Sequence, residues 1–204
     1  MGVISVLVGL LLPTLSAAVG EGRMTRAASQ VRQDAHLIDL YATDWKSIYP
    51  VAAPRWFDAA FNWYDPVRSG GYLESVEAAD PHGFRRAGFV GICMSGSMAC
   101  DPLMARPGAT LPVSQAPSAA VRTDQVQYPA SKGMVLQYYL SFGRYEGNYW
   151  CCSYEKPRAP VAFADGSTSV SRWIDMIVEP HAPPENNVGH PVISTWNGCR
   201  GRDR

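Results

Sequence analysis

Five cysteines are the most reactive side chains in this 204-residue sequence: Cys93, Cys100, Cys151, Cys152 and Cys199. All of them follow an uncharged N-terminal stretch, and in an exported protein such cysteines indicate disulfide bonds. Because adjacent cysteines seldom pair with each other, we expect one bond between Cys93 and Cys100, and a second from Cys151 or Cys152 to Cys199. None of the spacings matches the paired CxxC of a zinc ribbon.

Two histidines, His181 and His190, flank Glu185 in a proline-rich segment. Imidazole and carboxylate groups are common metal ligands, but this spacing fits no helix or turn that would hold three ligands around one ion. We therefore interpret all three as solvated loop residues and expect neither a metal nor a cofactor.

The side chains that suggest catalysis are His36, Ser95 and Ser97. His36 falls within a helical pattern, which favours a surface or half-buried position over that of a general base. The two serines are separated by a single glycine, so they do not form the Gly-x-Ser-x-Gly pattern of a nucleophile elbow. The sequence therefore predicts no catalytic residue.

Asp165 and Gly166 lie between two apolar segments, 160–164 and 167–173. An Asp-Gly pair in this position predicts a β-hairpin with a type I′ turn, which has positive φ at both central residues. The carboxylate of Asp165 also suits calcium, but the turn alone accounts for both residues, and we prefer that interpretation.

These groups need a framework, and its first element is a helix over residues 1–44. Residues 1–19 carry no charge and reach roughly 28 Å as a helix, close to the thickness of a bilayer's hydrocarbon core. The following residues turn amphipathic. The apolar positions of the first half are Val3, Ile4, Val6, Leu7, Val8, Leu10, Leu11, Leu12, Pro13 and Leu15. Those of the second half recur at three- and four-residue steps: Met24, Ala27, Ala28, Val31, Ala35, Ile38 and Tyr41.

Residues 45–204 predict one globular head of the α+β class. We expect a small antiparallel sheet with long irregular loops, because most of the chain's 18 glycines and 16 prolines fall in this part. Strands are expected at 134–142, 145–154 and 191–196, and in the two arms of the hairpin. Residues 174–178 either prolong the second arm of the hairpin or form a separate strand after it. A short helix is expected at 54–64. Residues 65–125 show no sustained periodicity. With 18 basic and 18 acidic residues, the chain lacks the excess positive charge of a nucleic-acid-binding protein.

Five stretches together resemble a known family. They are GVISVLVGLLLPTLSAA, LIDLYATDWKSIYP, VQYPASKGM, VAFADGSTSV and PVISTWNGCRGRDR. The first two are similar to the N-terminal helix of type IV pilins and type II secretion pseudopilins. The others are similar to the prepilin-type branch of that group that carries a His-x9-Asp-Gly signature.

This resemblance implies a structural subunit of a type IV pilus or type II secretion filament, not an enzyme. Residues 1–44 would form the membrane and filament-core helix, crossing the bacterial inner membrane once. Residues 45–204 would form a head in the periplasm or on the cell surface. The implied partners are other copies of the chain or related pilin-like subunits, together with the inner-membrane assembly machinery, and not nucleic acid.

The sequence departs from the family at two points. Ten positions before Asp165 it has Glu155 instead of histidine, and the family's Phe-Thr-Leu-x-Glu segment is missing before the apolar run. The resemblance therefore predicts a truncated N-terminus, with about nine helical residues and a basic leader encoded upstream. The alternative function is that of a membrane-tethered or secreted enzyme, or of a ligand-binding domain, with its site in the unassigned middle of the chain.

Overall fold

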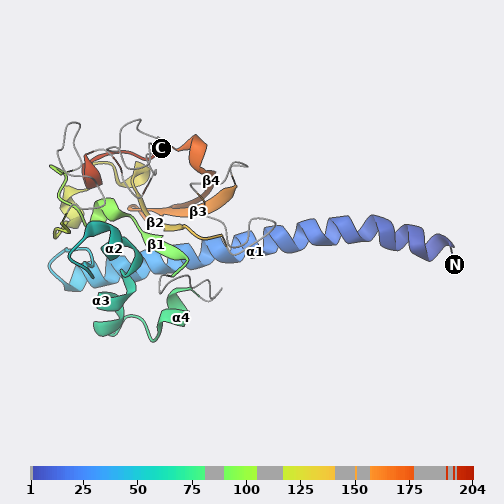
Figure 1. Cartoon of the computed structure of the whole chain (residues 1–204), viewed down its shortest axis with the longest axis horizontal. Helices are drawn as coiled ribbons and strands as arrows, with labels where there is room; N and C mark the ends of the chain where they lie inside the picture. The colour runs from blue at the N-terminus through green and yellow to red at the C-terminus, as the bar shows by residue number, and fades with distance from the viewer. Residues whose placement is uncertain are drawn as a thin grey trace.

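The computed structural model describes residues 2–80, 90–104, 117–140, 150, 157–176, 192, 195 and 197–204, and of residues 2–8, 10 and 173 the backbone only. A single long helix, α1 (Gly2–Asp44), packs on a four-stranded antiparallel sheet. The prediction of an α+β fold with a long N-terminal helix is confirmed (Figure 1). The predicted end of that helix, at residue 44, is confirmed as well.

The head is built from short elements. Its helices are α2 (Trp56–Phe61), α3 (Tyr64–Ser69) and α4 (Val76–Ala79), and its strands are β1 (Ile92–Met94), β2 (Gly133–Gln137), β3 (Arg158–Phe163) and β4 (Thr168–Arg172). The strands follow one another in the sheet in the order β1-β2-β3-β4, and each pairs antiparallel with the next. Single turns of 3₁₀-helix include η1 (Gly96–Met98), η3 (Thr123–Gln125), η4 (Pro129–Ser131), η6 (Trp173–Asp175) and η7 (Gly198–Arg200).

The C-terminal half of α1 forms the centre of the head. It lies between the sheet on one side and the α3–α4 segment on the other (Figure 1). Five of the side chains predicted at three- and four-residue steps are buried, because that spacing places them on one stripe of the helix: Met24, Ala27, Val31, Ala35 and Ile38. Ala42, which was not predicted, is buried as well. Ala28 and Tyr41, at the edge of this stripe, are half-buried.

Both faces of the sheet are covered by apolar side chains. Met94, Val135 and Ala162 occupy adjacent positions on neighbouring strands and pack in one core cluster with α1. The residues one position along, Cys93, Leu136 and Val161, belong to a second cluster that also contains Trp56 and Phe61 of α2. Successive side chains of a strand point to opposite faces, so these two sets of strand side chains lie on opposite faces of the sheet. The helix α1 contributes to both clusters, through Met24 and Ala27 to the second.

Several predicted boundaries are wrong. The helix expected at 54–64 is two helices, because α2 ends at Phe61 and α3 begins at Tyr64. The strand expected at 134–142 leaves the ladder after Gln137, where the backbone N–H groups of Tyr138 and Tyr139 both donate to the Gly91 carbonyl. After β4 the chain forms η6 in place of further strand. Most of the strands expected at 145–154 and 191–196 lies outside the described residues.

The turn after α1 has an unusual backbone. Lys46 and Ser47 both have positive φ, 57° and 61°, although neither is glycine. Such conformations are uncommon for residues with a side chain and persist where the surroundings hold them. Here the Ser47 carbonyl accepts a hydrogen bond from the Thr123 N–H at 2.8 Å, and Ile48 pairs with Arg122. The turn thereby attaches η3 to the end of the long helix.

Candidate functional site

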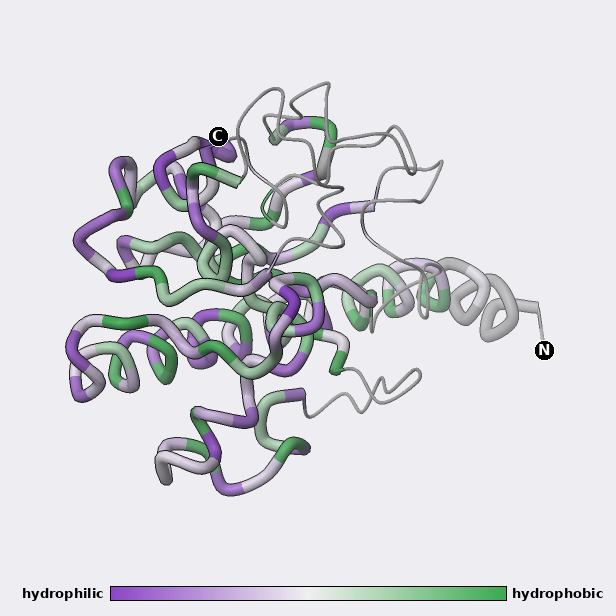
Figure 2. Tube along the Cα trace, turned by 60° about the vertical axis from the view of Figure 1, so that its left-hand side comes forward, coloured by the Kyte–Doolittle hydropathy of each residue, from purple (hydrophilic) through white to green (hydrophobic). Residues whose placement is uncertain are grey.

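The N-terminal half of α1 projects away from the head as a single continuous helix (Figure 1). Leu11, Leu12 and Leu15 are 63%, 60% and 61% exposed, and Val19 is 48% exposed. Green, hydrophobic segments recur along the described part of this projection (Figure 2). The structure therefore presents large apolar side chains to solvent along one face of the helix, because Leu11, Leu15 and Val19 follow one another at four-residue steps and Leu12 lies beside them.

The predicted helix residues divide into two sets. Leu11, Leu12, Pro13 and Leu15 are all exposed, and α1 continues through Pro13 without a break. The side chains of the others lie outside the described residues: Val3, Ile4, Val6, Leu7, Val8 and Leu10. Over the part of the chain that the structure describes, no helix is long and apolar enough to cross a membrane.

The change from projecting helix to packed helix occurs at residues 21–24. Glu21 accepts a hydrogen bond from the Arg158 guanidinium at 2.8 Å, and Arg158 is the first residue of β3. Both side chains are largely exposed, so this ion pair contributes at most about 1 kcal/mol. Met24 is the first side chain of α1 to enter the core.

The predicted bond between Cys93 and Cys100 is absent, because both residues are buried free thiols, and so is Cys199. Cys93 lies in β1, whereas η1 carries the chain away from the sheet before Cys100, whose thiol contacts the Asp101 carbonyl at 3.5 Å. Burial raises the pKa of all three thiols, that of Cys100 to about 11. A thiol with a raised pKa is a poor nucleophile.

The remaining cysteines, Cys151 and Cys152, lie outside the described residues. Because Cys199 is a free thiol, the predicted bond from one of them to Cys199 is absent as well.

Ser95 and Ser97 are buried and attach the C-terminal segment to the head. The Ser95 hydroxyl donates to the Val192 carbonyl, and the Ser97 hydroxyl accepts from the Thr195 N–H at 3.1 Å. Neither serine lies beside a histidine among the described residues. Both hydroxyls thus help to anchor the C-terminal segment.

A buried ion pair that the sequence analysis missed lies beside these serines. The Lys132 ammonium and the Asp203 carboxylate are 2.8 Å apart, and both side chains are fully buried. Asp203 also accepts hydrogen bonds from the N–H groups of Gly133 and Val192, each at 2.9 Å, and from the Thr195 hydroxyl. A buried charge needs such partners, and together they fix the end of the chain against the start of β2.

Two arginine side chains attach the C-terminal residues 202–204 to the surface of the head. The Arg202 guanidinium lies 3.9 Å from the centre of the Tyr128 ring, and that of Arg204 lies 3.7 Å from the centre of the Phe163 ring. Arg204 also donates to the Ala130 carbonyl at 2.8 Å. Cation–π contacts of this kind add modest stability at exposed sites.

Asp165 and Gly166 form the hairpin turn between β3 and β4, but the predicted type I′ geometry is wrong. Only Gly166 has a positive φ, at 80°, and its N–H donates to the Phe163 carbonyl at 2.9 Å. The loop has three residues and ends in a left-handed glycine, the second common solution for hairpins. Burial alone would raise the pKa of Asp165, but hydrogen bonds from Ser167 and the charge of Arg204 lower it overall.

Titratable groups on the packed half of α1 have unusual surroundings. Asp34 is fully buried, and burial together with the nearby Asp80 raises its pKa well above the ordinary value, although Gln30 donates to it at 3.0 Å. Asp39 is partly buried, and its pKa is raised by burial to about 6, with His36 opposing the shift. His36 itself is exposed, as expected for a helix-surface residue.

His181, Glu185 and His190 lie outside the described residues. Within the ranges that are described, no group of three or more His, Cys, Asp or Glu side chains is placed to hold a metal ion.

No protein-family model matches this chain, and no curated protein or solved structure is significantly similar to it. The assignment of a function therefore depends on the geometry described above and on the sequence resemblance.

Proposed function

We propose that this protein is a pilin-like or pseudopilin-like structural subunit that assembles through the N-terminal half of α1. The observation that carries the proposal is the exposure of Leu11, Leu12, Leu15 and Val19 on a helix that projects beyond the head. A monomeric soluble protein seldom exposes so many large apolar side chains along one element, and such surfaces indicate contact with other molecules.

The two halves of α1 divide the work of such a subunit. The C-terminal half is held rigidly between the sheet and the α3–α4 segment, so the head fixes the direction in which the N-terminal half projects. The first twenty residues carry no charged side chain. Neighbouring apolar helices can therefore pack against this half without burying an unpaired charge.

The same surface can be covered by lipid before assembly and by neighbouring subunits after it. Its apolar side chains are accommodated by lipid or by the helices of neighbouring copies, so transfer between these surroundings has a small hydrophobic free energy. We accordingly place the subunit in the bacterial inner membrane, with one membrane-inserted helix and the head in the periplasm or on the cell surface. Its partners are other copies of itself or related subunits, and the inner-membrane assembly machinery.

A charge-insertion experiment tests this role. Leu12→Glu and Leu15→Glu each place a charge on the projecting helix, and Leu103→Glu places one on a leucine of the head that is 54% exposed. We expect the full chain with either helix substitution not to sediment with membranes. In the absence of detergent, it should not form assemblies that sediment. The head variant should sediment like the original protein.

The melting temperature of the head provides the second readout. It should be unchanged in all three variants, because none of the altered side chains is buried. If both helix variants still sedimented and assembled to the original extent, the projecting helix would not be the assembly surface and the proposal would be wrong.

A further inference from the structure

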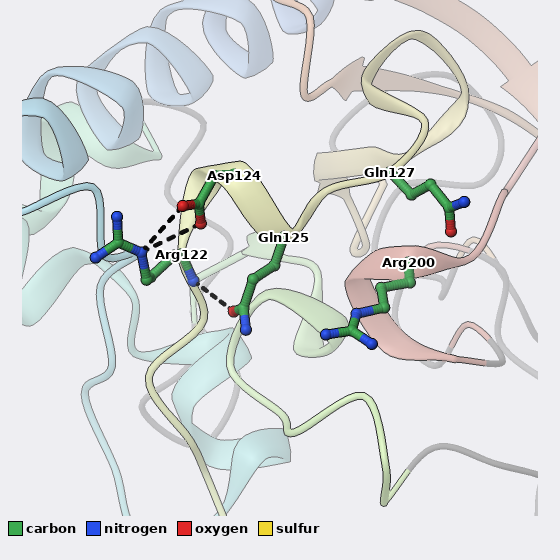
Figure 3. A pocket seen from close by; sticks show the side chains of 5 residues that line it. All are labelled: Arg122, Asp124, Gln125, Gln127 and Arg200. Carbon is green, nitrogen blue, oxygen red and sulfur yellow. Dashed lines mark hydrogen bonds and ion pairs between the residues drawn. The ribbon is translucent and has the colours of Figure 1, made fainter.

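An open cavity of about 600 Å³ lies at the end of the head opposite the projecting helix. The residues that line it come from two segments far apart in sequence, and all have polar or charged side chains: Arg122, Asp124, Gln125, Gln127 and Arg200 (Figure 3). The first four lie in or beside η3, and Arg200 ends η7. This volume is within the range of small-molecule sites.

The charges on the η3 side of the cavity largely cancel. The Arg122 Nε–H donates to both carboxylate oxygens of Asp124, at 3.2 and 3.3 Å (Figure 3). The Oε1 atom of Gln125 accepts a hydrogen bond from the Arg122 backbone N–H at 2.9 Å. This bond fixes which end of the Gln125 amide is engaged, so its NH₂ group remains as a donor for a ligand.

Arg200 supplies the remaining positive charge. Its side chain extends from η7 toward the side of the cavity where Gln125 lies (Figure 3). Among the described residues no carboxylate forms an ion pair with it, and its side chain is exposed. The cavity therefore presents one uncompensated guanidinium together with two amide side chains.

The backbone that carries Arg200 is held firmly. Gly198 has a φ of 58°, and a Cβ atom there would lie 3.2 Å from the Pro102 Cα. Cys199 is buried, and Asp203 is anchored in the buried ion pair with Lys132. Arg200 thus projects from a segment whose position is set before any ligand arrives, which reduces the entropy lost on binding.

We propose that this cavity binds a small hydroxylated carboxylate, such as an acidic sugar. A guanidinium offers paired N–H donors in the geometry that a carboxylate accepts. The amides of Gln125 and Gln127 can both donate and accept, which matches hydroxyl groups. The proposal concerns the head alone and does not depend on how the long helix assembles.

The test compares two sugars that differ at one group. D-glucuronate and D-glucose share their ring hydroxyls, but only glucuronate has a carboxylate. Each is titrated into the full chain in neutral detergent micelles, and binding is followed by NMR of the side-chain amide and arginine Nε–H signals. We expect saturable shifts of the Gln125, Gln127 and Arg200 signals with glucuronate and none with glucose.

Three variants assign the effect to the cavity. Arg200→Gln should weaken glucuronate binding about tenfold, because it removes the charged donor. Gln127→Glu adds a negative charge to the lining and should weaken binding as well. Arg202→Gln is the matched control, since that guanidinium lies over Tyr128 and not in the cavity, and it should bind as the original chain does.

Equal melting temperatures of the variants establish that they are folded. Saturable binding of glucose with the same affinity as glucuronate would overturn the proposal. So would an absence of shifts with glucuronate, or unchanged glucuronate binding by folded Arg200→Gln.

Discussion

At the scale of single residues, the turn between β3 and β4 depends on one glycine. Gly166 adopts a φ of 80°, and apart from Gly166 itself and its two chain neighbours no atom lies within 4 Å of the point where a Cβ would stand. The penalty for a side chain is therefore backbone strain alone, which is greatest for β-branched residues. We expect Gly166→Val to lower the free energy of unfolding by about 1–2 kcal/mol, measured by urea denaturation.

Asp165→Asn is the matched control for that prediction. The Oδ1 atom of Asp165 accepts hydrogen bonds from the Ser167 N–H at 2.9 Å and the Ser167 hydroxyl at 2.6 Å, and asparagine retains this oxygen. The control should lose less stability than Gly166→Val. Equal losses in the two variants would count against the left-handed glycine as the critical feature of the turn.

Asp34 should make the stability of the head depend on pH. Its folded-state pKa is raised by burial and by Asp80, so between the ordinary value near 3.8 and the raised value the folded chain binds more protons than the unfolded chain. Stability from this group is therefore complete below pH 3.8 and is lost as the pH rises through the folded-state pKa.

Asp34→Asn removes this titration while keeping an oxygen that can accept from Gln30. The variant should gain stability relative to the original chain as the pH rises from 4 to 8, in urea denaturation at each pH. Gln33→Asn, on the exposed face of the same helix, alters no ionisable group, so it serves as the control and should run parallel to the original chain. A difference between Asp34→Asn and the original chain that does not change with pH would refute the assignment.

At the scale of elements, α1 was the most predictable part of the fold. Its three- and four-residue period identifies the buried stripe without any knowledge of what covers it.

Two positions test the stripe directly. Ile38 is fully buried and Leu40, two residues later, is 42% exposed. Ile38→Ala should lower the free energy of unfolding by about 2–5 kcal/mol, and Leu40→Ala by less than about 0.5 kcal/mol.

The sheet was harder to predict for physical reasons. β1 has only three residues, and all of them are buried, so the alternation that identifies a half-exposed strand is missing. The Asp-Gly pair located the hairpin correctly but not its geometry. A three-residue loop that ends in glycine and a two-residue loop that contains glycine have similar local sequences, and the strand register, Ala162 opposite Thr168, selects between them.

At the scale of the whole molecule, the features missed by the sequence analysis all join distant segments. Lys132 and Asp203 are 71 positions apart, and Ser97 and Thr195 are 98 apart. In the sequence, each appears as an ordinary polar residue near a glycine or a proline. Their pairing requires the tail to return to the start of β2, and no local propensity encodes that return. The cavity between η3 and η7 depends on the same closure.

The projecting part of α1 should be separable from the head. From Gly9 to Arg23, every described side chain is exposed or half-exposed, and the core begins at Met24. Deleting residues 2–22 removes no described core contact. The described side-chain interactions with the retained chain that it removes are exposed: the hydrogen bond from the Thr25 hydroxyl to the Glu21 carbonyl, and the Glu21–Arg158 ion pair, which stabilises by at most about 1 kcal/mol. We expect the shortened chain to melt within a few degrees of the full chain and not to self-associate in analytical ultracentrifugation.

Deleting residues 2–35 gives the complementary result. This change removes Val31 and Ala35, both in the core cluster between α1 and the sheet, and leaves the inner faces of β1, β2 and β3 without their cover. We expect that chain to lose its cooperative melting transition. If the shorter deletion also unfolded the head, the exposed half of α1 would be part of the fold. If the shortened head instead melted normally but self-associated as the full chain does, assembly would reside in the head and not in the helix.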